Sequence, residues 1–182
     1  MRKAIFLDRD GTLNPDPGYI SDPADFELFP GVPQALARLK KAGYLLILIT
    51  NQSGISRGMI SPQQLELVHQ KLQNLLAAES VTLDAIYFCP HHPEYPLHGI
   101  TECECRKPQP GMILQAKKDF DIDLAASYVI GDRRKDIQIG INAGVRPICI
   151  RPQPAPGYEN VPTFVSLSEA VDWLLAAAAD KV

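Results

Sequence analysis

The most constraining stretch of this sequence is the run YLLILIT at residues 44–50. An unbroken apolar run of this length is typical of a β-strand that is buried on both faces. A strand covered on both faces belongs to a parallel sheet that carries a layer of helices on each side. Further strands are expected at residues 3–8, 83–89, 127–131 and 146–150.

Helical patterns alternate with these strands. Gly43 is placed to end the first helix, and Ser61 followed by Pro62 is a typical N-cap and first helical residue. Ser166 is a candidate cap for the last helix. Helices are expected at residues 30–42, 62–79, 111–120, 134–143 and 167–178, with an irregular proline-rich segment at 151–162. The alternation predicts an α/β fold built on a doubly wound parallel sheet.

Polar residues stand where the predicted strands end. Asp8 closes the first strand, Thr50 the second, and Asp132 follows the fourth. Because ligands of such sheets bind beyond the carboxyl ends of the strands, we expect these side chains to share one site. Two longer interruptions, 14–29 and 91–110, emerge at the same edge and are expected to shape substrate entry. Neither is long enough to fold as a large cap domain.

The acidic residues at this edge predict a metal and a phosphoryl-transfer reaction. Asp8 and Asp10 lie so close that they need a cation between them, and with Asp132 they offer the few hard oxygen ligands that suit Mg²⁺. Asp8, at the rigid end of a strand, is our candidate nucleophile. Asp10, in the turn, is our candidate general acid and base. The alternative is a turn capped by its own carboxylates.

The bulk composition restricts the other function classes. Residues 1–182 are 46% hydrophobic and 21% charged, which suits one soluble domain. The net charge of -3 argues against a surface that neutralises nucleic-acid phosphates. The apolar run after Met1 is too short for a signal peptide, and no stretch is long enough to span a bilayer. We expect a cytoplasmic monomer with reduced cysteines and no membrane partner.

Three of the four cysteines form a second candidate metal site with one histidine. The motifs are CPH at 89–91 and CEC at 103–105, and side chains two apart in an extended segment point the same way. Such a donor set suits a closed, structural Zn²⁺ site, and its alternative is reduced surface thiols beside a stray histidine. His92 and His98 are weaker candidates, and Cys149 is expected in the core. The predicted zinc ligands are Cys89, His91, Cys103 and Cys105.

Four motifs, LDRDGTLN, ITNQSG, CRKPQPGM and VIGDRRKDIQIG, resemble in order those of the haloacid dehalogenase (HAD) superfamily of aspartate-nucleophile phosphatases. The resemblance covers nearly the whole chain. It implies that Asp8 is the nucleophile and Asp10 the acid and base. It also implies that Asp8, the carbonyl of Asp10, and Asp132 hold Mg²⁺. Thr50 would donate its hydroxyl to the phosphoryl oxygens, and Lys107 would neutralise charge on the phosphoryl group and on Asp8.

Outside this motif set, several of these residues have simpler interpretations. Taken alone, Thr50 would more readily be interpreted as a residue that caps the turn after its strand. Lys107 lies between Arg106 and a proline, and taken alone it would be interpreted as a surface lysine. For Asp136 we prefer a supporting role beside Asp132, with metal binding through water as the alternative. The zinc loop, about residues 89–107, is expected to pin Lys107 over the phosphate site. Arg106 offers a planar fork for a second anionic group of the substrate.

The segments CPHHPE and CECRKPQPGM look like the histidinol-phosphatase-related branch of the superfamily. The length of the loop from His91 to Cys103, the segments CPHHP and KPQPGM, and NQSGISRGMIS resemble its heptose bisphosphatases most. The implied reaction removes the 7-phosphate of D-glycero-D-manno-heptose 1,7-bisphosphate, which serves lipopolysaccharide core synthesis. Arg133 stands where many of these enzymes have lysine, which keeps the charge and changes the hydrogen-bond geometry. The implied substrate contacts are Asp16, Pro17, Gly18, Tyr19, Thr50, Asn51, Gln52, Ser53, Arg106 and Arg133.

Three alternatives to this function remain at the level of the sequence. The first is a histidinol-phosphate phosphatase, for which Glu102 and Glu104 would face the substrate amine. The second is a nucleic-acid 3'-phosphatase, disfavoured by the acidic balance and the lack of a basic, aromatic-rich stripe. The third is a non-catalytic module that binds metal and a partner protein. Such a module has no need for the full set of acidic, hydroxyl and lysine residues.

Overall fold

The computed structural model describes residues 1–179, and this part of the chain folds around a six-stranded sheet. The strand order is β3-β2-β1-β4-β5-β6, and every neighbouring pair is parallel. The strands are β1 (Ala4–Leu7), β2 (Leu45–Asn51), β3 (Ala85–Cys89), β4 (Tyr128–Gly131), β5 (Arg146–Ile150) and β6 (Thr163–Phe164). The predicted doubly wound parallel sheet is confirmed.

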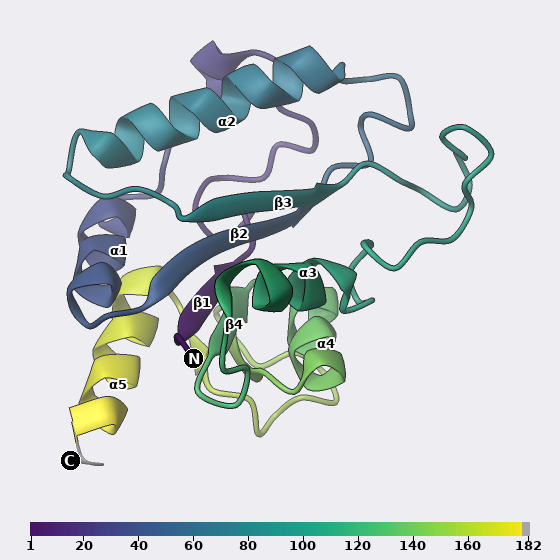
Figure 1. Ribbon diagram of the computed structural model, residues 1–182. Helices are drawn as coiled ribbons and strands as arrows, with labels where there is room; N and C mark the ends of the chain where they lie inside the picture. Colours follow the sequence, from purple (N-terminus) through teal and green to yellow (C-terminus); the bar gives the residue numbers. More distant parts are fainter. Residues whose placement is uncertain (180–182) are drawn as a thin grey trace.

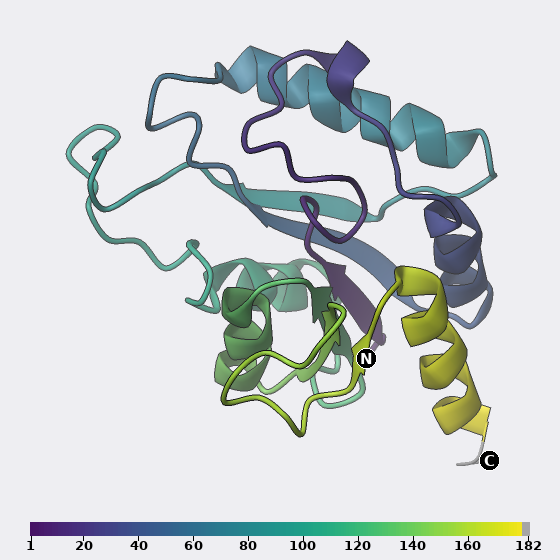
Figure 2. The same ribbon diagram turned by 180° about the vertical axis from the view of Figure 1, so that it is seen from behind.

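Helices cover both faces of the sheet (Figure 1). They are α1 (Val32–Lys41), α2 (Pro62–Ala77), α3 (Gly111–Phe120), α4 (Arg134–Ala143) and α5 (Leu167–Ala179). α1, α2 and α5 pack on one face and α3 and α4 on the other, an arrangement that Figure 2 shows from behind. Within β2, Leu46 and Leu48 enter the first core while Ile47 and Ile49 enter the second. Burial on both faces explains why this strand is apolar throughout.

The helix signals of the sequence act at the positions where they were expected. The Ser61 hydroxyl accepts the backbone N–H of Gln64 at 3.1 Å, and the Gln64 side chain accepts that of Ser61 at 2.8 Å, which forms a capping box. Gly43, with a φ of +83°, follows the end of α1. The Ser166 hydroxyl accepts the N–H of Glu169 in the first turn of α5. None of the helices in residues 1–179 has the length and apolar character to cross a bilayer.

Two short elements were not predicted from the sequence. The strand β6 contains two residues, too few to produce an alternating pattern, and it follows the expected irregular segment 151–162. The 3-10 helix η1 (Pro23–Asp25) lies in the first long interruption, where Asp22 caps it by accepting the N–H of Ala24. Both elements depend on local contacts that hydrophobic periodicity does not encode.

The order of the strands brings the ends of β1 and β4 together. From β1 the chain adds β2 and β3 on one side and then β4, β5 and β6 on the other, so the direction of winding changes between β1 and β4. Leu7 is in register with Ile130, and the N–H of Asp8 donates to the carbonyl of Ile130 at 2.9 Å. Such a switch point forms a crevice at the carboxyl edge. Within the described residues, neither of the long connections at this edge folds into a cap domain.

Candidate active site

Three acidic side chains meet where β1 and β4 end. Asp8, Asp132 and Asp136 each offer a carboxylate oxygen within 4.8 Å of the others. The turn after β1 approaches Asp132 so closely that a Cβ at Gly11 would lie 2.4 Å from Asp132 Oδ2, and Gly11 has a φ of +84°. Only glycine meets both requirements. One oxygen of Asp132, Oδ1, is buried without a hydrogen-bond partner among the described residues, as suits a ligand for a cation.

Lys107 supplies the positive charge behind these acids. Its Nζ lies 2.7 Å from Asp8 Oδ1 and 2.6 Å from Asp136 Oδ1, and it donates to the carbonyl of Ile49 at 3.0 Å. The side chain is fully buried. Burial opposes its charge, yet Asp136 and Asp8 raise the pKa of Lys107, so the ammonium stays charged. The structure therefore brings Lys107 to the reacting end of the crevice, as the motif resemblance implied.

Asn51, at the end of β2, fixes the backbone of Lys107. Its side-chain oxygen accepts the N–H of Lys107 at 3.0 Å, and its side-chain nitrogen donates to the carbonyl of the same residue at 3.1 Å. An irregular loop is thus held to the sheet by two bonds from one side chain. Asn51 also lines the cavity described below, so it faces the site predicted for it.

Asp136 lies behind Asp132 and is buried. It accepts the N–H of Arg133 at 3.0 Å and forms the ion pair with Lys107. A Cβ at Gly131 would lie 2.3 Å from the Cβ of Asp136, so glycine is required before Asp132 for α4 to approach the strand. These contacts describe a side chain that bonds to the backbone near Asp132 and orients Lys107, in line with the supporting role that the sequence suggested.

The electrostatics of the cluster explain why it needs a further cation. Burial and the neighbouring Asp136 raise the pKa of Asp8 to about 7, although Lys107 acts in the opposite direction. Burial and Asp136 also raise the pKa of Asp132. Two carboxyls that resist ionisation at one point become stable as carboxylates when a divalent cation binds between them. The donor set, made of oxygens only, fits Mg²⁺.

Asp10 is held by three side chains. The Arg9 guanidinium donates from Nε to Oδ1 and from Nη2 to Oδ2, both at 3.0 Å. Asn14 donates to Oδ1 at 3.0 Å and Gln52 to Oδ2 at 2.9 Å. Burial acts to raise the pKa of Asp10, but the charge and hydrogen bonds of Arg9, with those of Asn14 and Gln52, hold this pKa below its ordinary value. The carboxylate therefore has a fixed orientation at the edge of the crevice.

Sequence reasoning missed Arg9 and Asn14, and it placed Gln52 differently. Arg9 is 1% exposed, unusual for an arginine without a bound anion, and its guanidinium packs over the ring of Phe26. Gln52 is buried and donates to both Asp10 and Thr50, so the structure places it beneath the cavity rather than in its lining. The sequence signal that could have indicated Arg9 is an arginine between two acids directly after a buried strand.

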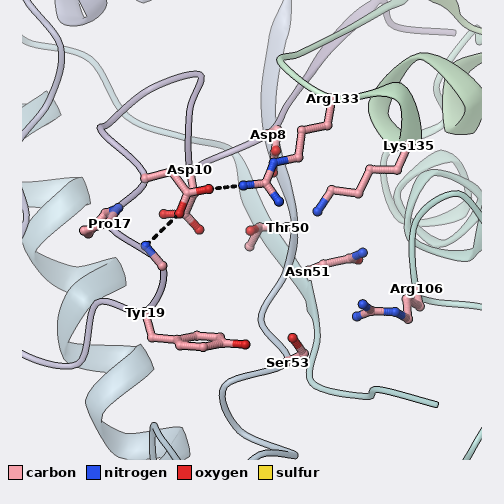
Figure 3. Close-up of a pocket in the computed structure, with 12 residues that line it drawn as sticks. Asp8, Asp10, Pro17, Tyr19, Thr50, Asn51, Ser53, Arg106, Arg133 and Lys135 are labelled. Atoms are coloured by element: carbon pink, nitrogen blue, oxygen red, sulfur yellow. Dashed lines mark hydrogen bonds and ion pairs between the residues drawn. The ribbon is translucent and has the colours of Figure 1, made fainter. Parts of the chain in front are cut away.

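A cavity of about 470 Å³ opens above these groups (Figure 3). Thr50, which is buried at the end of β2, forms part of its floor with Asp8 and Asp10. The structure brings together most of the predicted contact residues there and adds one that sequence reasoning did not single out, Lys135. The lining residues are Asp8, Asp10, Asp16, Pro17, Gly18, Tyr19, Thr50, Asn51, Ser53, Arg106, Arg133 and Lys135.

Positively charged side chains project into the cavity from one side. Figure 3 shows Arg106, Arg133 and Lys135 opposite Pro17 and Tyr19. Arg133 is paired with Asp16 across the mouth and lies 3.7 Å from Asp132. Arg106 donates from Nη1 to the carbonyl of His91 at 2.8 Å, which ties it to the loop beside the cysteine cluster. A cavity of this size and charge suits a small substrate with more than one anionic group.

The four predicted zinc ligands converge. The sulphur atoms of Cys89, Cys103 and Cys105 lie 3.1, 3.3 and 3.6 Å apart, and Nδ1 of His91 lies 3.4 and 3.8 Å from two of them. Sulphurs bound to a tetrahedral zinc at about 2.3 Å would lie about 3.8 Å apart. The cluster thus has the donors and nearly the dimensions of a closed four-ligand site. Burial raises the pKa of the Cys89 thiol. A cation bound at the cluster would stabilise the thiolate form.

The other histidines and the fourth cysteine lie elsewhere. His92 faces away from the cluster, with Nε2 at 3.0 Å from Arg57 Nη2, and Tyr95 packs beside both side chains. His98 is outside the group of four ligands. Cys149, in β5, is buried in a small core cluster, as expected.

Comparisons with known proteins agree with this geometry. A family model described as HAD-hydrolase-like matches residues 104–152. The D-glycero-beta-D-manno-heptose-1,7-bisphosphate 7-phosphatase of Yersinia pestis is 43% identical to this chain, and the match covers 97% of this chain and 92% of that protein. The enzyme of the same name from Escherichia coli strain K12 is 42% identical, and the match covers 97% of this chain and 90% of that protein. A crystal structure of D,D-heptose 1,7-bisphosphate phosphatase from B. bronchiseptica, complexed with magnesium and phosphate, superimposes with a TM-score of 0.83 at 33% identity, covering 96% of this chain and 99% of that one.

Proposed function

Since this chain belongs to the HAD-like hydrolases, and within them to the family of the heptose-1,7-bisphosphate 7-phosphatases, we propose that it removes the 7-phosphate of D-glycero-D-manno-heptose 1,7-bisphosphate. The observation that carries the proposal is the buried contact of 2.7 Å between Lys107 Nζ and Asp8 Oδ1 on the floor of a cation-lined cavity. A carboxylate held this way is aimed at an electrophile that itself carries negative charge.

The reaction proceeds in two steps that use Asp8 and Asp10. In the first, the Asp8 carboxylate forms a bond to phosphorus while the bond from phosphorus to the sugar oxygen breaks, and Asp10 gives that oxygen a proton. In the second, Asp10 takes a proton from a water molecule that attacks phosphorus, which releases phosphate and restores Asp8. Arg9 keeps both oxygens of Asp10 oriented for these transfers.

The charges on the transferred phosphoryl group are balanced by this chain and a divalent ion. Lys107 neutralises Asp8, and the Thr50 hydroxyl donates to a phosphoryl oxygen. Asp8, the carbonyl of Asp10, and Asp132 would hold Mg²⁺. When bound, Mg²⁺ supplies charge stabilisation of the phosphoryl oxygens.

The rest of the cavity recognises the sugar and its second phosphate. Arg106 and Arg133 line the cavity and provide planar donors suited to a phosphate. Asp16, Tyr19 and Ser53 offer polar groups for sugar hydroxyls. Because no cap domain covers this edge in the described residues, recognition rests on the segment around Tyr19 and on the zinc loop.

The cysteine cluster binds one Zn²⁺ ion with a structural role. Its four protein ligands leave no open position for water, unlike a catalytic zinc site. The cluster ends directly before Arg106 and Lys107, so an ion there would fix the loop that delivers both cations. We also propose that the chain acts as a single domain and as a monomer in the cytoplasm. The single domain is supported by the one sheet that joins all six strands of the described residues, and the cytoplasm by the cysteine cluster, whose thiols must stay reduced to bind a metal.

The test is phosphate release with Mg²⁺ from a panel of phosphate esters. The panel contains both anomers of heptose 1,7-bisphosphate, histidinol phosphate, fructose 1,6-bisphosphate and a 3'-phosphorylated oligonucleotide. We expect the highest kcat/KM with a heptose bisphosphate and release from the 7-position. Preference for histidinol phosphate would keep the chemistry and overturn the substrate. Preference for the oligonucleotide, or activity with none of them, would overturn the proposed function.

A further inference from the structure

Lys135 faces the cavity without a partner. It is the second residue of α4 and lines the cavity with its amine directed inward (Figure 3). Within residues 1–179, none of the ion pairs found at a limit of 4.0 Å includes Lys135, and its amine makes no hydrogen bond. An ammonium in a half-buried position is therefore left with no acceptor from this part of the chain.

The other cations of the site are all engaged. Lys107 is paired with two carboxylates, Arg9 with Asp10, and Arg133 with Asp16. Arg106 donates to a backbone carbonyl. Lys135 therefore differs from them in having its whole hydrogen-bonding capacity available to a ligand.

Lys135 lines the same cavity as Asp8 and Thr50. Burial and the charge of Lys107 lower the pKa of Lys135, while Asp8 acts to raise it. Lys135 in turn is one of the charges that lower the pKa of Asp8. Figure 3 shows the Lys135 amine directed into the part of the cavity that lies beside Asp8 and Thr50. Among the ion pairs of residues 1–179, none joins Lys135 to Asp8. A phosphoryl group bound in this cavity at Asp8 would offer oxygens that accept from an ammonium at about 2.8 Å.

We propose that Lys135 is a catalytic residue that donates from Nζ to a non-bridging oxygen of the phosphoryl group as it is transferred to Asp8. Lys107 would then hold the nucleophile from behind while Lys135 meets the phosphoryl group from the cavity side. This inference rests on the proposed phosphatase function. It differs from the role in recognising the second phosphate, which is proposed above for Arg106 and Arg133.

The test compares Lys135→Gln with the wild type on two substrates. Heptose 1,7-bisphosphate carries two phosphates, whereas p-nitrophenyl phosphate carries only the one that is transferred. We expect kcat/KM to fall about 10- to 100-fold on both substrates, the loss typical of one charged hydrogen bond in a transition state. Lys135→Arg should recover part of the loss. Lys118→Gln, at an exposed lysine of α3, is the matched control and should change neither value.

Two measurements that need no turnover complete the test. Calorimetric binding of inorganic phosphate with Mg²⁺ should weaken in Lys135→Gln. Its unfolding temperature should be unchanged or higher, because the lysine has no partner to lose. A loss confined to the bisphosphate, or no change in either activity or phosphate affinity, would overturn the proposal. A wild type active on p-nitrophenyl phosphate and inactive on the heptose would overturn only the proposed substrate.

Discussion

The guanidinium of Arg9 holds the carboxylate of Asp10 through two parallel bonds of 3.0 Å each. The two residues are neighbours in the sequence, and Arg9 is almost completely buried. Such a fork-to-fork contact fixes both the position and the plane of a carboxylate. An acid and base that serves two different oxygen atoms in succession needs this control of orientation.

Replacing Arg9 with methionine should therefore impair proton transfer more than binding. We expect kcat to fall about 10- to 100-fold with a smaller change in KM. Because Arg9 lowers the pKa of Asp10, its removal should move the pKa assigned to Asp10 in the pH–rate profile to a higher value. Arg38→Met, which removes an exposed arginine paired with Asp172, is the control. An unshifted profile in Arg9→Met would contradict this role.

Asp10→Asn should separate the two steps of the reaction. p-Nitrophenolate is a good leaving group that needs no proton, so the first step should survive, whereas hydrolysis of the intermediate loses its base. We expect a burst of about one equivalent of p-nitrophenol per chain, followed by slow turnover. With the heptose substrate no burst should appear, since the sugar oxygen must be protonated. If activity fell equally on both substrates and no burst appeared with p-nitrophenyl phosphate, Asp10 would not act on the leaving group.

The pKa of Asp8 predicts how pH affects magnesium binding. This pKa is raised by burial and Asp136 to about 7, so a proton competes with the ion at pH 6 and hardly at pH 8. The apparent Kd for Mg²⁺ should be about tenfold weaker at pH 6, measured by calorimetry. In Asp8→Asn this difference should disappear. A Kd that is independent of pH in the wild type would contradict the assignment.

The carboxyl group of Asp8 also affects how the stability of the fold depends on pH. A carboxyl whose pKa is raised on folding stabilises the fold at low pH, and this contribution is lost as pH rises from about 4 to 7. The metal-free protein should therefore lose stability from this group over that range. Mg²⁺, which binds the ionised form, should raise the Tm more at pH 8 than at pH 6. Thermal unfolding with and without Mg²⁺ at the two pH values measures this difference.

Removing a cysteine of the cluster should abolish zinc binding and weaken catalysis. In Cys103→Ser we expect less than about a tenth of the zinc of the wild type, because a structural site needs all four ligands. Activity should fall at least about tenfold, since the loop carrying Lys107 loses its anchor. Cys149→Ala, which changes a core residue of β5, should keep both zinc and activity. Equal zinc contents in the two variants, by elemental analysis, would contradict the assignment.

The strand-end acids were predictable because parallel strands deliver their carboxyl ends to one edge. Asp8 and Asp132 follow paired strands, and the buried runs around them are plain in the sequence. Lys107 was predictable only from the motif resemblance, because it stands in an irregular loop far along the chain from Asp8. Its position depends on Asn51 and Asp136, and no local pattern encodes those contacts.

Arg9 and Lys135 escaped prediction for a different reason. Arg9 turns inward only because Asp10, Asn14 and Gln52 surround one carboxylate, which requires three segments in place. Lys135 was expected to lie on a helix, but the periodicity of α4 does not say which side of its first turn faces the crevice. The direction of a side chain at a helix end is set by the strand before it and by the close packing at Gly131.

The most direct test of the account is to find where phosphate is attached during turnover. Asp10→Asn is mixed with p-nitrophenyl phosphate and Mg²⁺, quenched, and treated with borohydride, which reduces an acyl phosphate to homoserine. Trypsin cleaves after Lys3 and Arg9, so the peptide AIFLDR at residues 4–9 contains Asp8 and not residue 10. We predict homoserine at position 8 in this peptide and none in Asp8→Asn. Modification of a different peptide, or of none while p-nitrophenol is released in the burst, would contradict Asp8 as the nucleophile.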